Sequence, residues 1–350
     1  MEKTIKDDEK EQELLSILKL ISPGTALRTA LDDIAKAKLG ALIVIGDSPE
    51  VLKLTNGGFE VNCKFNSQKL VELCKMDGAI ILDSEIKKIL FANTLLVPDH
   101  TILTNETGTR HKAAERTARQ TGQLVITVSE RKNIISIYKG NIKYVLKSSE
   151  DILNRADATL RMLEKEKERF SELILNINVL EFTNLTSIND VITAVQRAEI
   201  SSRIEDIIRR YILELGVEGS LVKIQLKEMR KGIDSEELLM LKDYSLKDPF
   251  LTKLALAELS LDQLIDPTNI TSLLGYQKQD EAVLPRGYRM LGKTSLPKTE
   301  VDNLIKEAGN LSSVFDSPEK VSRVIGDSRA SILSKELAQL KEQVLLNKKI

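Results

Sequence analysis

Two short runs of wholly apolar residues constrain the fold of this chain more than any other feature. Residues 40–46 read G-A-L-I-V-I-G, and residues 78–82 read G-A-I-I-L. Each run is short and rich in β-branched side chains, so each predicts a strand that is buried on both faces of a sheet. Such a sheet needs helices on both faces, which indicates an α/β domain.

Further elements are predicted around these two runs. Helical periodicity at residues 8–21 and 25–38 is interrupted by Ser22-Pro23-Gly24, and a shorter helix is expected at residues 70–75. Helices and strands do not alternate strictly, so we expect a mixed sheet with helices on its faces. The remaining strands are predicted at residues 59–65, 89–97, 124–129, 134–138 and 142–146.

The strand pattern stops near residue 148, and the rest of the chain has helical periodicity. We therefore expect an α/β domain over residues 1–148, an all-α linker domain over residues 149–284, and a small all-α domain over residues 285–350. Their net charges are +3, −8 and +4, from 22, 17 and 12 basic against 19, 25 and 8 acidic residues. The two basic segments can meet anions, whereas the acidic middle segment is a poor nucleic-acid surface. The linker helices are predicted at residues 153–175, 187–215, 219–231, 235–241, 249–254 and 261–264.

Composition limits the compartment and the metal chemistry. No apolar run reaches membrane-spanning length, and the acidic residues 1–13 do not fit a signal peptide, so we expect a cytoplasmic protein with no membrane association. Cys63 and Cys74 lack metal-ligand spacing and are predicted to be buried free thiols. With only two histidines in the chain, a zinc site of the usual kind is not expected.

A loop that leads into a helix over residues 104–122 is a candidate anion site. It reads T-N-E-T-G-T-R-H-K-A-A-E-R-T-A-R-Q-T-G, and the final glycine is a suitable helix C-cap. At the helix start, free backbone N–H groups and the positive end of the helix dipole meet Thr107, Thr109, Arg110, His111 and Lys112, a combination suited to phosphate. Cations on a first helical turn are also common on solvated surfaces, so this stretch alone leaves both interpretations open.

Two other polar positions lie at predicted strand ends. Asp77 precedes the buried strand at residues 78–82, where its carboxylate could meet a metal ion or a sugar hydroxyl; alone, it could equally be an ordinary turn residue. The segment Ser129-Glu130-Arg131-Lys132 follows another apolar strand and offers a hydroxyl, a carboxylate and two cations. Its alternative interpretation is a polar hairpin turn.

These stretches together resemble a known family. D-G-A at residues 77–79 followed by G-T-R-H at residues 108–111 resembles the nucleotide site of diadenylate cyclases, and the order of segments over nearly the whole chain resembles the DNA integrity scanning type. The resemblance implies that two ATP molecules become cyclic di-AMP and two pyrophosphates. Because each nucleotide attacks the other, it also implies a homo-oligomer, expected to be an octamer, in which two sites face each other.

The resemblance also implies roles for individual residues. Asp77 would hold a divalent metal, Mg²⁺ or Mn²⁺, and would act in catalysis with Arg110 and His111. Lys112 departs from the family's R-H-R pattern, which keeps the charge but loses a planar bidentate donor. The implied nucleotide contacts are Asp77, Gly78, Ala79, Leu95, Leu96, Thr109, Arg110, His111, Lys112, Ser129 and Arg131.

The third segment contains a second nucleotide-binding pattern and a possible DNA module. Residues 287–294 read G-Y-R-M-L-G-K-T, which matches G-x-x-x-x-G-K-[ST], but no strand is predicted before it and a proline follows, so we expect no ATP-binding loop there. Two helices around a turn resemble a helix-hairpin-helix module, with Val324 in place of the first glycine and Gly309 marking a possible second turn. The resemblance implies contacts with branched or junction DNA, and so association with the chromosome; a plain helical tail for assembly is the alternative. The predicted DNA contacts are Ile325, Gly326, Asp327, Ser328 and Arg329.

Two functions therefore remain open. One is a cyclase whose output is tuned by bound DNA. The other is a DNA-binding scaffold with a nucleotide pocket of weak or no cyclase activity.

Overall fold

A computed structural model describes residues 2–346, and the chain divides into two compact units. The first unit contains the residues up to Ala156 together with Arg209–Lys223, and the second contains Asp157–Ile208 together with the residues from Ile224 onward. None of the helices in the described part of the chain is long and apolar enough to span a bilayer.

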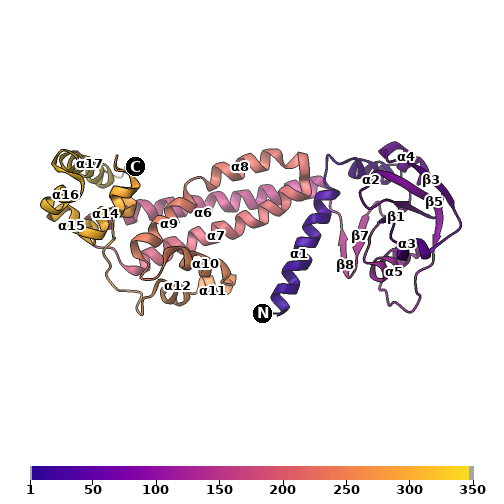
Figure 1. Ribbon diagram of the computed structural model, residues 1–350, viewed down its shortest axis with the longest axis horizontal. Helices are drawn as coiled ribbons and strands as arrows, with labels where there is room; N and C mark the ends of the chain where they lie inside the picture. The colour runs from indigo at the N-terminus through magenta and orange to yellow at the C-terminus, as the bar shows by residue number, and fades with distance from the viewer. Residues whose placement is uncertain (1, 347–350) are drawn as a thin grey trace. The chain divides into compact units, whose positions relative to one another are not determined.

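The first unit is built on a mixed, eight-stranded sheet, which confirms the predicted fold class (Figure 1). The strand order is β2-β5-β4-β1-β6-β7-β8, with β3 also pairing with β5. β1 and β4 are parallel, whereas the other pairs are antiparallel. The strands are β1 (Ala41–Ile45), β2 (Thr55–Asn56), β3 (Phe59–Lys64), β4 (Ala79–Leu82), β5 (Lys88–Leu96), β6 (Leu124–Val128), β7 (Ile135–Lys139) and β8 (Ile142–Val145).

Helices cover both faces of this sheet, as the two apolar runs require. In Figure 1, α5 (Thr109–Thr121) lies on one side of the strands, and α2 (Ala26–Lys36) and α4 (Ser67–Leu73) lie on the other. Alternate residues of each central strand point into two separate cores, one under α5 and one under α2, α4 and the end of α1 (Glu2–Leu20). The sequence analysis did not predict the short helix α3 (Pro49–Lys53), which Ser48 caps.

The remaining elements are helical, as predicted for the linker and the C-terminal segment. Three helices have residues in both units: α6 (Ser149–Thr183), α7 (Ile188–Leu215) and α8 (Ser220–Arg230). Two apolar cores lie in the second unit. The other helices are α9 (Ile233–Tyr244), α10 (Pro249–Glu258), α11 (Leu261–Ile265), α12 (Pro267–Leu274), α13 (Tyr288–Leu291), α14 (Lys298–Ala308), α15 (Leu311–Asp316), α16 (Pro318–Ile325) and α17 (Asp327–Leu345).

The predicted linker helices were too short in several places. α6 extends at both ends beyond the predicted 153–175, and α12 was not predicted although Asp266 caps it and Pro267 occupies its first turn. The short helices α13 and α15 were also missed, because four to six residues are too few for a periodic pattern. The division into three domains at residues 148/149 and 284/285 stays a proposal.

Candidate functional site

The register of the sheet gathers the predicted site residues at one edge. β1 and β4 run parallel with Ile43 opposite Ile80, whereas β6 runs antiparallel to β1 with Ala41 opposite Val128. The starts of β1 and β4 and the end of β6 therefore lie at the same edge. Asp77 just precedes β4, Gly40 precedes β1, and Ser129 follows β6, so these three residues lie at that edge.

The first turn of α5 completes this edge. Gly108 is its N-cap and offers no side-chain oxygen, so no side chain caps the first N–H groups of the helix. Gly122 ends the helix in the left-handed conformation, with its N–H bonded to Ala118 O, as predicted. An uncapped helix start of this kind is suited to an anionic ligand.

Side chains of α5 anchor the loop that leads into it. Arg116 Nε donates to Ile102 O at 2.9 Å, and Arg119 Nη1 donates to Leu103 O at 2.7 Å. Glu115 accepts hydrogen bonds from Arg119 and from the hydroxyl of Thr104. The loop is therefore held to the helix, which fixes the position of the helix start.

Arg110 joins the helix start to Asp77. Its Nη2 lies 2.8 Å from Asp77 Oδ1, and its Nη1 lies 3.8 Å from Glu130 Oε2. Gly40 leaves room for the guanidinium, because a methyl group there would lie 2.9 Å from Arg110 Cζ. Asp77 is 94% exposed, so its carboxylate remains open to a ligand. Gly40 was predicted only as the start of a buried strand, and its place beside Arg110 was not foreseen.

The D-G-A segment is fixed by close backbone packing. Gly78 has φ +94°, and a Cβ there would lie 2.8 Å from the backbone carbonyl carbon of Asn93, so only glycine fits without strain. Ala79 is fully buried. Of the two leucines predicted to contact the nucleotide, Leu95 is exposed, whereas the Leu96 side chain is buried in the core under α5. Leu96 could therefore contact a ligand only through its backbone.

His111 lies in a chain of hydrogen bonds beneath the helix start. Its Nδ1 lies 2.9 Å from Thr127 Oγ1 and 3.1 Å from the Tyr138 hydroxyl. Tyr138 donates to Glu106 Oε1 at 2.8 Å, and Glu106 also forms an ion pair with Lys143. Sequence reasoning missed Thr127, Tyr138, Glu106 and Lys143. A tyrosine at the end of an apolar strand was the available signal, since a buried phenol usually needs a partner.

Burial and charge set the ionisation of this chain. Burial lowers the pKa of His111, and Lys143, Lys132 and Arg110 lower it further, although Glu106 acts in the opposite direction. Burial raises the pKa of Tyr138, as does its hydrogen bond to Glu106. For Glu106, burial acts to raise the pKa, but the bonds from Lys143 and Tyr138 outweigh it and the net direction is downward. At neutral pH His111 is therefore an uncharged imidazole and Glu106 a carboxylate.

A cavity of about 630 Å³ lies against this edge. It is formed by the start of α5, the hairpin after β6, and residues of β7 and β8. Its four cations and the helix start suit a polyanion such as a triphosphate. Lys112 does not line it, because it lies about 200° around α5 from Arg110. The lining comprises Glu106, Thr107, Gly108, Thr109, Arg110, His111, Val128, Ser129, Glu130, Arg131, Lys132, Ile134, Ser136, Lys143 and Val145.

The donor set suits a metal held jointly with a substrate. Among residues 2–346, no group of three or more His, Cys, Asp or Glu residues is placed to hold a metal ion. Mg²⁺ is usually held by one or two carboxylates together with substrate phosphates and water. The exposed carboxylate of Asp77, beside a cavity suited to phosphates, fits that pattern.

The two cysteines were both predicted to be buried free thiols. Cys74 is buried, and burial raises the pKa of its thiol to about 12, whereas Cys63 is only half-buried.

Comparisons with known proteins show the family of this chain. Residues 28–142 match the family model of the DisA bacterial checkpoint controller nucleotide-binding region, and residues 146–283 match that of its linker region. A DNA integrity scanning protein DisA from Clostridium kluyveri is 44% identical over 97% of this chain and 99% of its own length. Another from Acetivibrio thermocellus is 44% identical over 97% of this chain and 98% of its own length. The chain belongs to the DisA family.

Membership of the DisA family also gives the enzyme class, which is diadenylate cyclase, as the sequence resemblance predicted. Among solved structures, a double mutant of DacA from Staphylococcus aureus is 23% identical, covering 40% of this chain and 90% of its own, with a TM-score of 0.30.

The C-terminal segment of this DisA-family chain contains two helix–turn–helix corners. α14 ends at Gly309, and α16 ends at Gly326; both glycines have φ of +83° and open space around them. Asn310 caps α15, whereas no side chain caps α17 at Gly326. The second corner thus presents free N–H groups, as a phosphate contact needs. Val324 replaces the usual first glycine and packs against the core.

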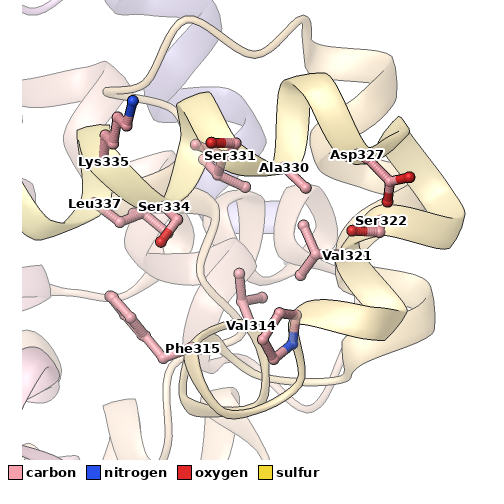
Figure 2. Close-up of a pocket in the computed structure, with 12 residues that line it drawn as sticks. Val314, Phe315, Val321, Ser322, Asp327, Ala330, Ser331, Ser334, Lys335 and Leu337 are labelled. Carbon is pink, nitrogen blue, oxygen red and sulfur yellow. The ribbon is translucent and has the colours of Figure 1, made fainter.

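The predicted DNA-contact residues surround this second corner. Asp327, Ser328 and Arg329 are exposed on the first turn of α17, and Ile325 is half-buried. Arg329 forms an ion pair with Glu300 of α14. A cavity of about 420 Å³ lies between α15, α16 and α17, and Figure 2 shows Asp327 and Ser322 at one end of it and Lys335 at the other. The DNA contacts of the residues around the second corner stay a prediction.

The G-x-x-x-x-G-K-T match forms a short packed helix whose first N–H groups are already bonded. Its middle residues form α13, and the N–H groups of Gly287, Tyr288 and Arg289 donate to the carboxylate of Asp243 rather than facing an open loop. The fully buried Arg289 forms ion pairs with Glu181 and Glu236. A nucleotide loop would need those N–H groups free and a strand before it.

Proposed function

We propose that the first unit condenses two ATP molecules into cyclic di-AMP and two pyrophosphates. One observation carries the proposal: Arg110 joins the exposed carboxylate of Asp77 to a cavity lined by four cations and an uncapped helix start. The triphosphate lies in the cavity against the helix start, and the 3′-hydroxyl lies near Asp77. The nucleotide contacts inferred from the sequence keep their roles within this arrangement, except Lys112, which does not line the cavity, and Leu96 acts through its backbone.

The chemistry is an in-line substitution at the α-phosphorus. The 3′-oxygen of one nucleotide forms a bond to the α-phosphorus of the other, and the bond from that phosphorus to the bridging oxygen breaks, releasing pyrophosphate. Asp77 orients the hydroxyl and favours loss of its proton to solvent water, and Arg110 neutralises charge on the phosphates. When bound, a divalent cation, Mg²⁺ or Mn²⁺, held by Asp77 and the phosphates would neutralise further charge.

Two copies of the site must face each other for this reaction. Each chain supplies one Asp77 and one helix start, so two nucleotides can exchange attack only across an interface between protomers. The exposure of Asp77 supports this arrangement, because the carboxylate is open toward solvent rather than closed in its own pocket. We propose a homo-oligomer, with an octamer expected; sedimentation with and without ATP tests it.

We further propose that the C-terminal segment binds branched or junction DNA and that this binding tunes the cyclase. The free helix start of α17 at Gly326 and the net charge of +4 over residues 285–350 support a phosphate contact that does not read bases. The corresponding location is the cytoplasm, where the protein would be associated with the chromosome.

The deciding experiment replaces Asp77 with Asn. Purified protein is incubated with ATP and Mg²⁺ or Mn²⁺, and cyclic di-AMP is measured by chromatography. We expect Asp77→Asn to lower turnover about a hundredfold or more, because positioning of the hydroxyl and of the metal is lost together. Asp47→Asn is the matched control: Asp47 follows β1 at the opposite edge of the sheet and accepts a hydrogen bond from Ser84.

Two outcomes would overturn the proposal. Unchanged turnover of the Asp77→Asn variant would remove the role of this carboxylate. If the wild-type protein makes no cyclic di-AMP but binds a DNA junction tightly, the alternative function, a DNA-binding scaffold with a nucleotide pocket, is favoured.

A further inference from the structure

The hydrogen bonds around His111 determine which of its nitrogens carries a proton. Glu106 is a carboxylate and can only accept, so the single hydroxyl hydrogen of Tyr138 is donated to Glu106 at 2.8 Å. The Tyr138 oxygen is then an acceptor toward His111 Nδ1, which lies 3.1 Å away. The proton of the neutral imidazole is therefore favoured on Nδ1, because an unprotonated Nδ1 would set its lone pair against that of the Tyr138 oxygen, and Nε2 is left without a proton.

The missing proton on Nε2 limits how His111 can bind a phosphate. His111 lines the cavity that suits a triphosphate. A nitrogen without a proton cannot donate to a phosphate oxygen, so in this tautomer Nε2 must first gain a proton. We propose that Tyr138, fixed by Glu106 and Lys143, is a positioning residue that keeps the neutral proton of His111 on Nδ1, so that Nε2 takes up a proton when a nucleotide triphosphate binds.

The charged groups around His111 support uptake on binding rather than before it. Lys143 of β8, Lys132 of the hairpin after β6 and Arg110 of α5 itself disfavour a charged imidazole, and Glu106 of the preceding loop favours it. From β6 and β7, Thr127 and Tyr138 contribute neutral hydroxyls. The negative charge of a triphosphate in the cavity would offset the three cations and so favour the charged imidazolium form of His111.

Removing the Tyr138 hydroxyl should change the tautomer without removing the imidazole. In Tyr138→Phe, Thr127 Oγ1, which lies 2.9 Å from Nδ1, can donate to that nitrogen and move the proton to Nε2. Glu106→Gln should act in the same direction, because the amide can donate to the Tyr138 oxygen and free its hydrogen for Nδ1. In both variants a neutral His111 can already donate to phosphate, so no proton needs to be taken up.

The test is calorimetry with a probe that cannot react. Binding of an ATP analogue with a methylene group in place of the α,β-bridging oxygen is measured with Mg²⁺ near pH 8, in buffers of different ionisation enthalpy. We expect the wild-type protein to take up about one proton for each bound nucleotide, and its affinity to fall about tenfold per pH unit at higher pH. Tyr138→Phe and Glu106→Gln should take up far less and lose this pH dependence. His100→Gln, which alters the other histidine of the chain, should behave as wild type.

The inference rests on the proposed nucleotide site but not on turnover. A protein that makes no cyclic di-AMP yet shows the expected proton uptake would refute the proposed reaction and leave this inference intact. The inference is overturned if the wild-type protein binds the analogue without proton uptake. It is also overturned if Tyr138→Phe takes up as many protons as wild type, or if His100→Gln abolishes the uptake.

Discussion

Gly40→Ala is the sharpest test of how the site is assembled. Gly40 does not have a positive φ, so alanine introduces no backbone strain there. The new methyl group would instead lie 2.9 Å from Arg110 Cζ and overlap the guanidinium. A guanidinium is the far end of a flexible side chain, so it will move rather than disrupt the fold. Its contact with Asp77 and its position at the cavity will be lost.

The expected magnitudes separate activity from stability. The ion pair of Arg110 with Asp77 is largely exposed, and such pairs contribute about 0–1 kcal/mol, so the free energy of unfolding should change by less than about 1 kcal/mol. Displacing a positioning group by about 1 Å can cost a hundredfold in rate. We therefore expect kcat/KM for cyclic di-AMP formation to fall about a hundredfold, which corresponds to about 2.7 kcal/mol of transition-state stabilisation.

The matched control is Gly122→Ala at the other end of α5. Gly122 has φ +67° and open space around it, so alanine there should lower the free energy of unfolding by about 1–2 kcal/mol without touching Arg110. Gly40→Ala should thus lower kcat/KM in steady-state kinetics with little change in thermal denaturation. Gly122→Ala should lower thermal stability with little change in kcat/KM. A Gly40→Ala variant that keeps wild-type kcat/KM, or whose structure retains the contact between Arg110 and Asp77, would contradict the role given to Gly40.

Three further predictions concern the second unit. Glu300→Gln releases Arg329 from its ion pair, so affinity for junction DNA at low salt should rise about threefold by fluorescence anisotropy; no change would mean that Arg329 does not limit binding. Arg289→Met leaves Glu181 and Glu236 without their buried partner and should cost about 3–5 kcal/mol in urea unfolding, whereas Arg323→Met at an exposed position should cost almost nothing; equal effects would contradict the structural role of Arg289. Burial and the nearby Glu237 raise the pKa of Glu199 to about 8, so its contribution to stability is complete below about pH 4.5 and is lost as the pH rises through 8. Glu199→Gln should therefore raise the free energy of unfolding at pH 8.5 by roughly 2–4 kcal/mol and flatten its pH dependence, and a variant with the wild-type pH profile would exclude this origin.

Local sequence patterns predicted most of the strands and longer helices, together with the candidate groups. The apolar runs at residues 40–46 and 78–82 required strands covered on both faces, because their side chains have no polar face to turn to water. The glycine at 122 and the uncapped start after Gly108 located α5 to within a residue, because capping depends on local chemistry. Arg110, His111 and Asp77 were candidates from their residue types and from the family resemblance, and their roles stay predictions.

Only the tertiary structure decided which of these groups meet. Asp77 precedes its strand and Ser129 follows its own, and they share one edge only because β6 runs antiparallel to β1 while β4 runs parallel to it. The space that Gly40 leaves for Arg110, and the chain from His111 through Tyr138 to Glu106 and Lys143, join segments far apart in sequence. Strand direction and register follow from how the whole sheet packs, so no local pattern could have predicted them.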